Sequence, residues 1–177
     1  MSGLTLENIP KAVPMTNTGS VGDHILLIEA RHLTALPDPT GSTLEAMGSI
    51  PAASITRAAG QAWRRIDCTL DKGSVKSEPL GGRDQTTFRN TATIHLAHNN
   101  ELKIGFSNFV SNKDFIALVP ERASRKYRVL GRLIDPAHIK AASDTGDAPD
   151  GDNENRFVIE SIGPMAPMVT GPITVAP

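Results

Sequence analysis

The sequence predicts a mainly β protein: an antiparallel β-sandwich or barrel with one flanking α-helix, extended terminal arms and a long loop. Residues 86–97 (TTFRNTATIHLA) alternate apolar and polar side chains, the pattern of a strand with one buried face. Residues 115–120 (FIALVP) form a short apolar run that is typical of a buried strand. About residues 100–111 the period changes to that of an amphipathic helix. Many strand patterns around a single helix favour a sandwich or a barrel.

The first third of the chain predicts one strand between two irregular segments. Residues 1–22 contain two prolines and no sustained period, so we expect an N-terminal arm. The apolar run His24–Ala30 predicts the first strand of a core domain that extends over residues 23–162. Leu36–Gln61 has few charges, with a helical turn possible near Ala53–Ala62. Loops of this length inside a compact domain usually serve a function or bind a partner.

The next segments predict a group of strands. Ile66–Leu70 (IDCTL) alternates, with Cys68 on the apolar face. Ser74–Leu80 is expected to be an edge strand because Pro79 cannot donate to a ladder. In residues 86–97, the face predicted to point into the core consists of Phe88, Asn90, Ala92, Ile94 and Leu96.

The helix has a clear start signal. Asn99 and Asn100 are both good helix caps. Four apolar residues then follow at helical spacing, and we expect them on the buried face: Leu102, Phe106, Phe109 and Val110.

The last part of the chain predicts a hairpin, an acidic loop and an apolar tail. Residues 126–134 (KYRVLGRLI) are expected to pair with the preceding buried strand, and residues 138–142 to form a further short strand. Ser143–Asn155 is an acidic loop before the last predicted strand, residues 156–162. Residues 163–177 carry no charge and several prolines and apolar side chains. We expect this C-terminal arm to lie on a surface, and another copy of the chain is one candidate for it.

Composition excludes several classes of protein. The 177 residues suit one domain, and the formal net charge of -1 gives no overall attraction to nucleic acid or to an anionic membrane. A single cysteine, Cys68, excludes an internal disulfide framework and a multi-cysteine zinc site. The chain has no apolar run long enough to span a membrane and no secretory signal at its start. We therefore expect synthesis in a reducing cytoplasm.

The sequence offers no convincing site for catalysis, a cofactor or a metal ion. It has no glycine-rich phosphate loop and no serine nucleophile elbow. Cys68 alternates with Ile66 and Leu70, which favours a core residue over a nucleophile. His95 and His98 lie at the end of a strand and not on one helix face, so surface histidines are favoured over zinc ligands. We expect no enzyme activity.

The acidic loop is the one arguable metal site. It supplies five carboxylates, which are Asp144, Asp147, Asp150, Asp152 and Glu154. Their spacing does not match the twelve-residue calcium loop. A solvated hairpin loop is favoured, while calcium binding and a negative surface shared by several copies stay open.

Two segments place an aromatic residue among basic ones, as a nucleic-acid stacking surface requires. They are Trp63–Arg65 and Arg125–Arg128. Strand edges whose arginines pair with neighbouring acids are the favoured interpretation of both.

The order of elements from Trp63 to Ile162 resembles the tail tube (major tail) proteins of long-tailed bacteriophages. The resemblance is carried by the threonine-rich strand, the helix NNELKIGFSNFV, the FIALVP strand, the hairpin with KYRVLG, the acidic glycine-containing loop and RFVIES. It also extends to the related tubes of contractile tails and bacterial secretion systems.

This resemblance implies a virion structural protein. Six subunits would form a hexameric ring, and rings would stack by self-assembly into a hollow tube that delivers DNA without binding it specifically. The loop 36–61 would reach the adjacent ring, and the arms 1–22 and 163–177 would connect subunits. Sheets would continue across subunit boundaries. The partners would be other phage tail proteins (terminator, baseplate or tip, and tape measure), with assembly in the bacterial host cytoplasm.

A DNA conduit should have a neutral or acidic lumen, because such a surface does not hold phosphates. Some of the following carboxylates are expected to face it: Asp67, Asp71, Glu78, Asp84 and Glu101. Two alternatives stay open. One is another tail component, such as a terminator or joining protein. The other is a small β-barrel module that binds single-stranded nucleic acid or a carbohydrate.

Overall fold

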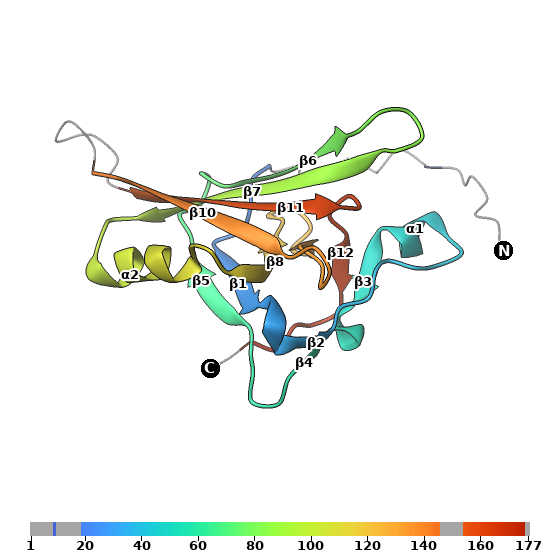
Figure 1. The fold of residues 1–177 in the computed structure, drawn as a ribbon, viewed down its shortest axis with the longest axis horizontal. Helices are drawn as coiled ribbons and strands as arrows, with labels where there is room; N and C mark the ends of the chain where they lie inside the picture. Colours follow the sequence, from blue (N-terminus) through green and yellow to red (C-terminus); the bar gives the residue numbers. More distant parts are fainter. Residues whose placement is uncertain (1–8, 10–18, 146–153, 176–177) are drawn as a thin grey trace.

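The computed structural model describes residue 9 and residues 19–145 and 154–175, and it has the mainly β fold that the sequence predicts. A ten-stranded sheet bends into two packed layers, and a small two-stranded sheet lies below them (Figure 1). All strand pairs except one parallel pair, β12 (Met168–Thr170) with β3 (Ser49–Pro51), are antiparallel. The expected sandwich with a flanking helix is therefore confirmed.

The upper layer contains four long antiparallel strands. In sheet order they are β6 (Ser74–Leu80), β7 (Thr87–Ala97), β11 (Glu154–Gly163) and β10 (Ala137–Asp144). The face of β7 predicted to point inward does so: Asn90, Ala92, Ile94 and Leu96 are buried. β6 is the edge strand, as Pro79 predicts.

The second layer is built around β8 (Asp114–Pro120), which pairs with β1 (His24–Glu29) on one side and β9 (Tyr127–Leu130) on the other. β5 (Arg64–Asp67) extends this layer beyond β1, and β12 and β3 extend it beyond β9. The chain crosses between layers after β9, where Gly131 has φ +94 and ends the strand. β10 then pairs with β8 only through Ala137 and His138 before it joins the upper layer.

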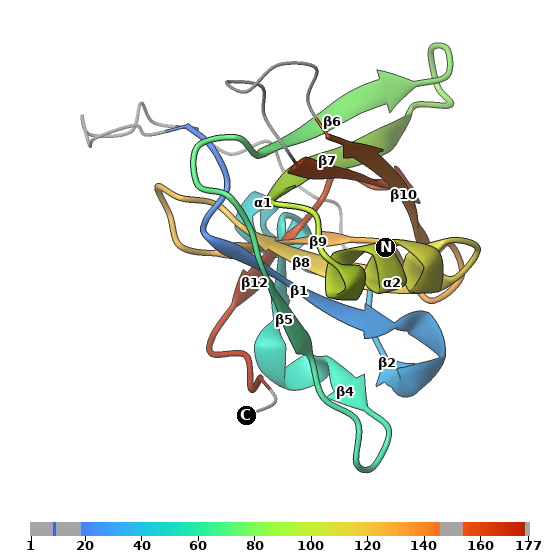
Figure 2. The same ribbon diagram turned by 90° about the vertical axis from the view of Figure 1, so that its left-hand side faces the viewer.

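Both faces of β1 and β8 are buried, which explains their continuous apolar sequences. Ile25 and Leu27 point into a core between the two layers, together with Phe115 and Ala117. The alternate residues of these strands, such as Leu118, point into a second core on the opposite side of the layer. Two apolar cores thus lie on opposite faces of this layer. Figure 2 shows the layer between the long strands of the upper layer and the two-stranded sheet.

The segment expected to be a long loop, residues 36–61, folds over this second core. It contains α1 (Leu44–Met47), β3, a 3-10 turn (Ala52–Ser54) and β4 (Thr56–Arg57), which pairs with β2 (Leu33–Ala35). The helical turn expected near Ala53–Ala62 is therefore only a short 3-10 turn at the start of that range. Ile50 and Ile55 are buried in the second core, so burial of a few apolar residues, and not periodicity, shapes this segment.

The C-terminal arm packs against its own chain. β12 inserts between β9 and β3, and Ala166 and Val169 are buried. The core therefore does not end at Ile162, and β11 is not the last strand. The sequence does not predict β12, because a strand of three residues is too short to show a periodic pattern.

The helix α2 (Glu101–Val110) begins as predicted, with the Lys103 backbone N–H donating to Oδ1 of Asn100 at 2.9 Å. Its buried face is rotated from the predicted one. Leu102 is 79% exposed and Phe109 is 47% exposed. Val110, in contrast, is buried, and Phe106 packs against the core between the two layers. The residues of α2 that are not exposed are Lys103, Phe106, Ser107 and Val110, and the Lys103 ammonium donates to the carbonyls of Ala97 and His98.

Three other predictions need adjustment. β5 begins and ends earlier than the predicted strand 66–70, so that Leu70 is exposed. β10 is longer than residues 138–142, because it pairs with β11 along its whole length. Of the N-terminal arm, Val21 is buried and pairs with Glu121, while residues 1–8 and 10–18 lie outside the described residues.

Candidate functional site

The outer face of the upper layer is a candidate functional surface of the described chain. No described element covers it in Figures 1 and 2. The strand register brings together a grid of polar side chains on this face, namely Ser74, Lys76, Glu78, Arg89, Thr91, Thr93, His95, His138, Lys140, Arg156 and Glu160. In a sheet with one face in solvent, polar and apolar residues alternate along each strand, and the strands of this layer show that alternation. We call this surface the open face.

The grid of side chains on the open face includes four cations, Lys76, Arg89, Lys140 and Arg156, and two carboxylates, Glu78 and Glu160. Lys140 donates to Glu160 at 2.6 Å, and Arg89 lies directly across the strand pair from Glu78. Glu154 accepts from Lys72 at 3.2 Å and forms a 2.7 Å pair with His95. Such pairs are screened and individually weak. These pairs offset part of the positive charge of the open face, and its grid of side chains keeps an excess of cations over carboxylates.

The upper layer has two edges that run in opposite directions. β6 forms one edge, and among the described residues its only strand partner is β7. At the other edge, on the side away from β11, β10 has no described strand partner beyond His138, although α2 contacts this strand. Unpaired strand edges expose backbone donors and acceptors that favour pairing with another chain.

An apolar hollow lies beside the β10 edge. Its volume is about 500 Å³, and Ile134, Pro136 and Ile162 line it together with charged residues of the open face. Ile134 is 74% exposed and Ile162 is 52% exposed. Exposed apolar side chains that cluster inside a polar rim mark an interaction surface.

The carboxylates expected at a lumen do not share one surface. Glu78 alone lies on the open face. Asp67 pairs with Arg65 at 2.7 Å, and Asp71 pairs with Arg122. Asp84 and Glu101 lie at opposite ends of β7, in the β6–β7 turn and at the start of α2. Strand register, which the sequence does not reveal, separates them.

Neither basic–aromatic segment forms a stacking platform. Trp63 is 2% exposed and belongs to the second core. Tyr127 is half-buried and bonded to His24, and Arg128 donates to Glu121 at 2.5 Å. Stacking requires an exposed aromatic face, so the strand-edge interpretation is the better one.

The metal candidates are not brought together in the part of the chain that the structure describes. There, no group of three or more His, Cys, Asp or Glu side chains is placed to hold an ion. His95 pairs with Glu154, whereas His98 is exposed with φ +62. Asp147, Asp150 and Asp152 of the acidic loop lie outside the described residues.

Cys68 carries a partly buried thiol that packs against the core between the two layers. Burial raises the pKa of this thiol to about 12, and the nearby Asp67 carboxylate adds to the shift. A thiol with so high a pKa carries almost no thiolate at neutral pH, so it is a poor nucleophile. This agrees with the core position that the alternation predicts.

One side-chain network has no signal in the sequence. Asp23 Oδ1 lies 2.6 Å from Nδ1 of His24, and Nε2 of His24 lies 2.9 Å from the Tyr127 hydroxyl. The hydrogen bond with His24 lowers the pKa of Asp23, whereas burial raises the pKa of Tyr127. A phenol with a raised pKa stays protonated and is not an activated nucleophile. The network therefore connects the start of β1 to β9, two strands that are far apart in the sequence.

Comparison with known proteins gives no match to a protein family, a curated protein or a solved structure. Among the described residues, no helix is long and apolar enough to cross a membrane. Function has to be argued from the surfaces of the molecule itself.

Proposed function

We propose that this protein is the tail tube subunit of a long-tailed bacteriophage, which forms stacked hexameric rings around a channel for DNA. One observation carries the proposal, namely a four-stranded antiparallel sheet with an open polar face, whose edges at β6 and over most of β10 have no further strand partner among the described residues. Because its strands alternate in direction and are even in number, β6 and β10 run in opposite directions. Copies placed side by side in a ring can therefore continue the sheet with antiparallel pairing at every boundary.

The dimensions of such a ring suit a conduit. Six copies, the number that the resemblance implies, give a closed barrel of about 24 strands. With strands about 4.8 Å apart and tilted by about 40°, the diameter between opposite backbones is on the order of 45 Å. Barrels of 16 to 18 strands already leave an aqueous channel, so a barrel of this size leaves a wider one.

The open face would line this channel, with part of its positive charge offset by carboxylates. DNA would pass without specific binding, because contacts to phosphates carry no sequence information and the ion pairs weaken the attraction of this face for a phosphate backbone. The apolar hollow at Ile134 and Ile162 would be covered by the neighbouring subunit's β6 edge. The protein would act mechanically, with no catalytic step.

Negative-stain electron microscopy of the purified chain, together with light scattering, tests the proposal. We expect hollow rings or tubes of uniform width at micromolar concentration, alone or after addition of a tail-tip initiator complex. A chain that stays monomeric with and without the initiator contradicts the proposal. Salt-dependent binding of single-stranded nucleic acid by that monomer would support the small binding module instead.

A further inference from the structure

Ser161 is a buried polar residue of the upper layer whose hydroxyl lacks a hydrogen-bond partner among the described residues. Its side chain points inward from β11. A buried hydroxyl without a partner is costly, and such groups commonly bind an ordered water.

The residue directly across the strand pair from Ser161 is Asn90. Asn90 is also buried, and its Oδ1 accepts from Ser77 Oγ at 2.6 Å and from the Ala166 backbone N–H at 3.1 Å. Its Nδ2 donates to the Pro164 carbonyl at 2.8 Å. A primary amide has two N–H donors, so one N–H of Asn90 has no partner among the described residues.

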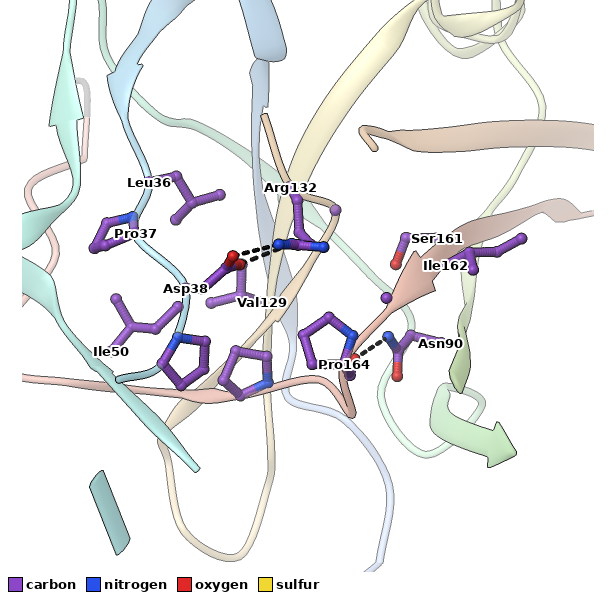
Figure 3. Close-up of a pocket in the computed structure, with 14 residues that line it drawn as sticks. Leu36, Pro37, Asp38, Ile50, Asn90, Val129, Arg132, Ser161, Ile162 and Pro164 are labelled. Carbon is purple, nitrogen blue, oxygen red and sulfur yellow. Dashed lines mark hydrogen bonds and ion pairs between the residues drawn. The ribbon is translucent and has the colours of Figure 1, made fainter. Parts of the chain in front are cut away.

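Both side chains line the same small hollow (Figure 3). Its volume is about 20 Å³, and four prolines, Ile50 and Val129 form much of its wall. On the far side, Asp38 accepts a 2.7 Å hydrogen bond from Nε of Arg132 and a second from Nη2, which holds the Pro37–Pro39 segment against the hollow. One water needs about 10–15 Å³ and at least two polar partners, whereas a larger ligand would not fit.

We propose that this hollow is a binding site for one structural water, which bridges Ser161 Oγ and the second Nδ2–H of Asn90. The Asn90 N–H donates to the water oxygen, and the Ser161 hydroxyl exchanges a hydrogen bond with the same water. Residues opposite each other on antiparallel strands have Cβ atoms about 4.5–5.5 Å apart, a separation that one water can span. The water would join β7, β11 and the Pro164–Ala166 turn, independently of any assembly.

The sign of one stability change tests this inference. If Ser161 holds a bridging water, Ser161→Ala removes a hydrogen-bond partner and lowers the Tm, by about 2–6 °C. If the hydroxyl is instead an orphan, Ser161→Ala removes a buried polar group and raises the Tm or leaves it unchanged. Ser42→Ala, on an exposed segment, is the matched control and should leave the Tm unchanged.

A crystal structure of the full chain at a resolution that shows ordered waters provides the second measurement. We expect one water within hydrogen-bond distance of Ser161 Oγ and Asn90 Nδ2, and its loss in Ser161→Ala. Amide hydrogen exchange at Ala166 should become faster in the same variant. An empty hollow in the unmodified chain, or a Tm that does not fall in Ser161→Ala, overturns the proposal.

Discussion

At the scale of single residues, a few buried polar groups determine how distant segments meet. Asn90 is the clearest example, because it lies inside an apolar face of β7 and bonds to β6 and to the turn before β12. The alternation of the strand predicts that Asn90 points inward, but it does not predict its partners. Those partners come from 13 to 76 residues away in sequence.

We expect Asn90→Ala to destabilise the chain by about 2–4 kcal/mol, because three hydrogen bonds are lost and their buried partners remain. Urea unfolding measures the loss. Amide exchange at Ala166 should increase more than at the centre of β8, since the C-terminal segment is the part released. Thr91→Ala, on the open face of the same strand, is the control and should cost less than about 1 kcal/mol.

Cys68 gives a prediction about pH. The folded-state pKa of about 12 lies above the unfolded value of 9.0. The unfolded chain therefore loses this proton first as pH rises. The stabilising contribution is complete below about pH 9 and is lost progressively between pH 9 and 12.

Urea unfolding at several pH values, for the natural chain and for Cys68→Ala, checks this. The variant should show a smaller decline in stability across this range. Alkylation of the natural thiol at pH 8 should be much slower in the folded chain than in urea. Equal alkylation rates in the two states would contradict the buried position of the sulfur.

At the scale of elements, α2 shows where periodicity succeeds and where it fails. The cap at Asn100 and the length of the helix follow from local sequence. The rotation of the helix about its axis does not, because it depends on which side chains find a partner at the edge of the sandwich. Lys103 is only partly exposed and its ammonium donates to two carbonyls, whereas Leu102 is exposed.

A pair of substitutions distinguishes the two orientations of α2. Leu102→Glu should change the free energy of unfolding by less than about 0.5 kcal/mol, since the side chain is exposed. Val110→Ala should cost about 1–3 kcal/mol through lost burial and a small cavity. The face predicted from periodicity would instead make both changes costly. Chemical denaturation of the two variants decides between these outcomes.

At the scale of the whole molecule, no described element covers the open face (Figures 1 and 2), and the edges at β6 and over most of β10 have no further strand partner among the described residues. The exposed Ile134 and Ile162 lie near one of these edges, where their exposed side chains add little burial to the single chain. In the proposed ring this patch is buried against the next subunit, so the same residues should matter for assembly and not for folding.

Ile134→Asp combined with Ile162→Asp therefore should leave the Tm of the monomer nearly unchanged but prevent ring or tube formation. Electron microscopy and light scattering measure assembly, and thermal unfolding measures folding. Leu102→Asp is the matched control, because it adds one charge at an exposed apolar position on α2. Tubes that form normally from the double variant would exclude this patch as a subunit contact.

The sequence by itself determined the mainly β class, the long strands β7 and β11, the buried strand β8, the edge character of β6 and the cap of α2. These features depend on local periodicity and on backbone chemistry, both of which can be read within a dozen residues. Only the tertiary structure decided that the segments 36–61 and 163–175 cover a second core, and that Asn90, Ser161 and the Pro164–Ala166 turn meet around one hollow. Short segments are fixed by burial against distant strands, and strand register places their partners, so no local pattern records them.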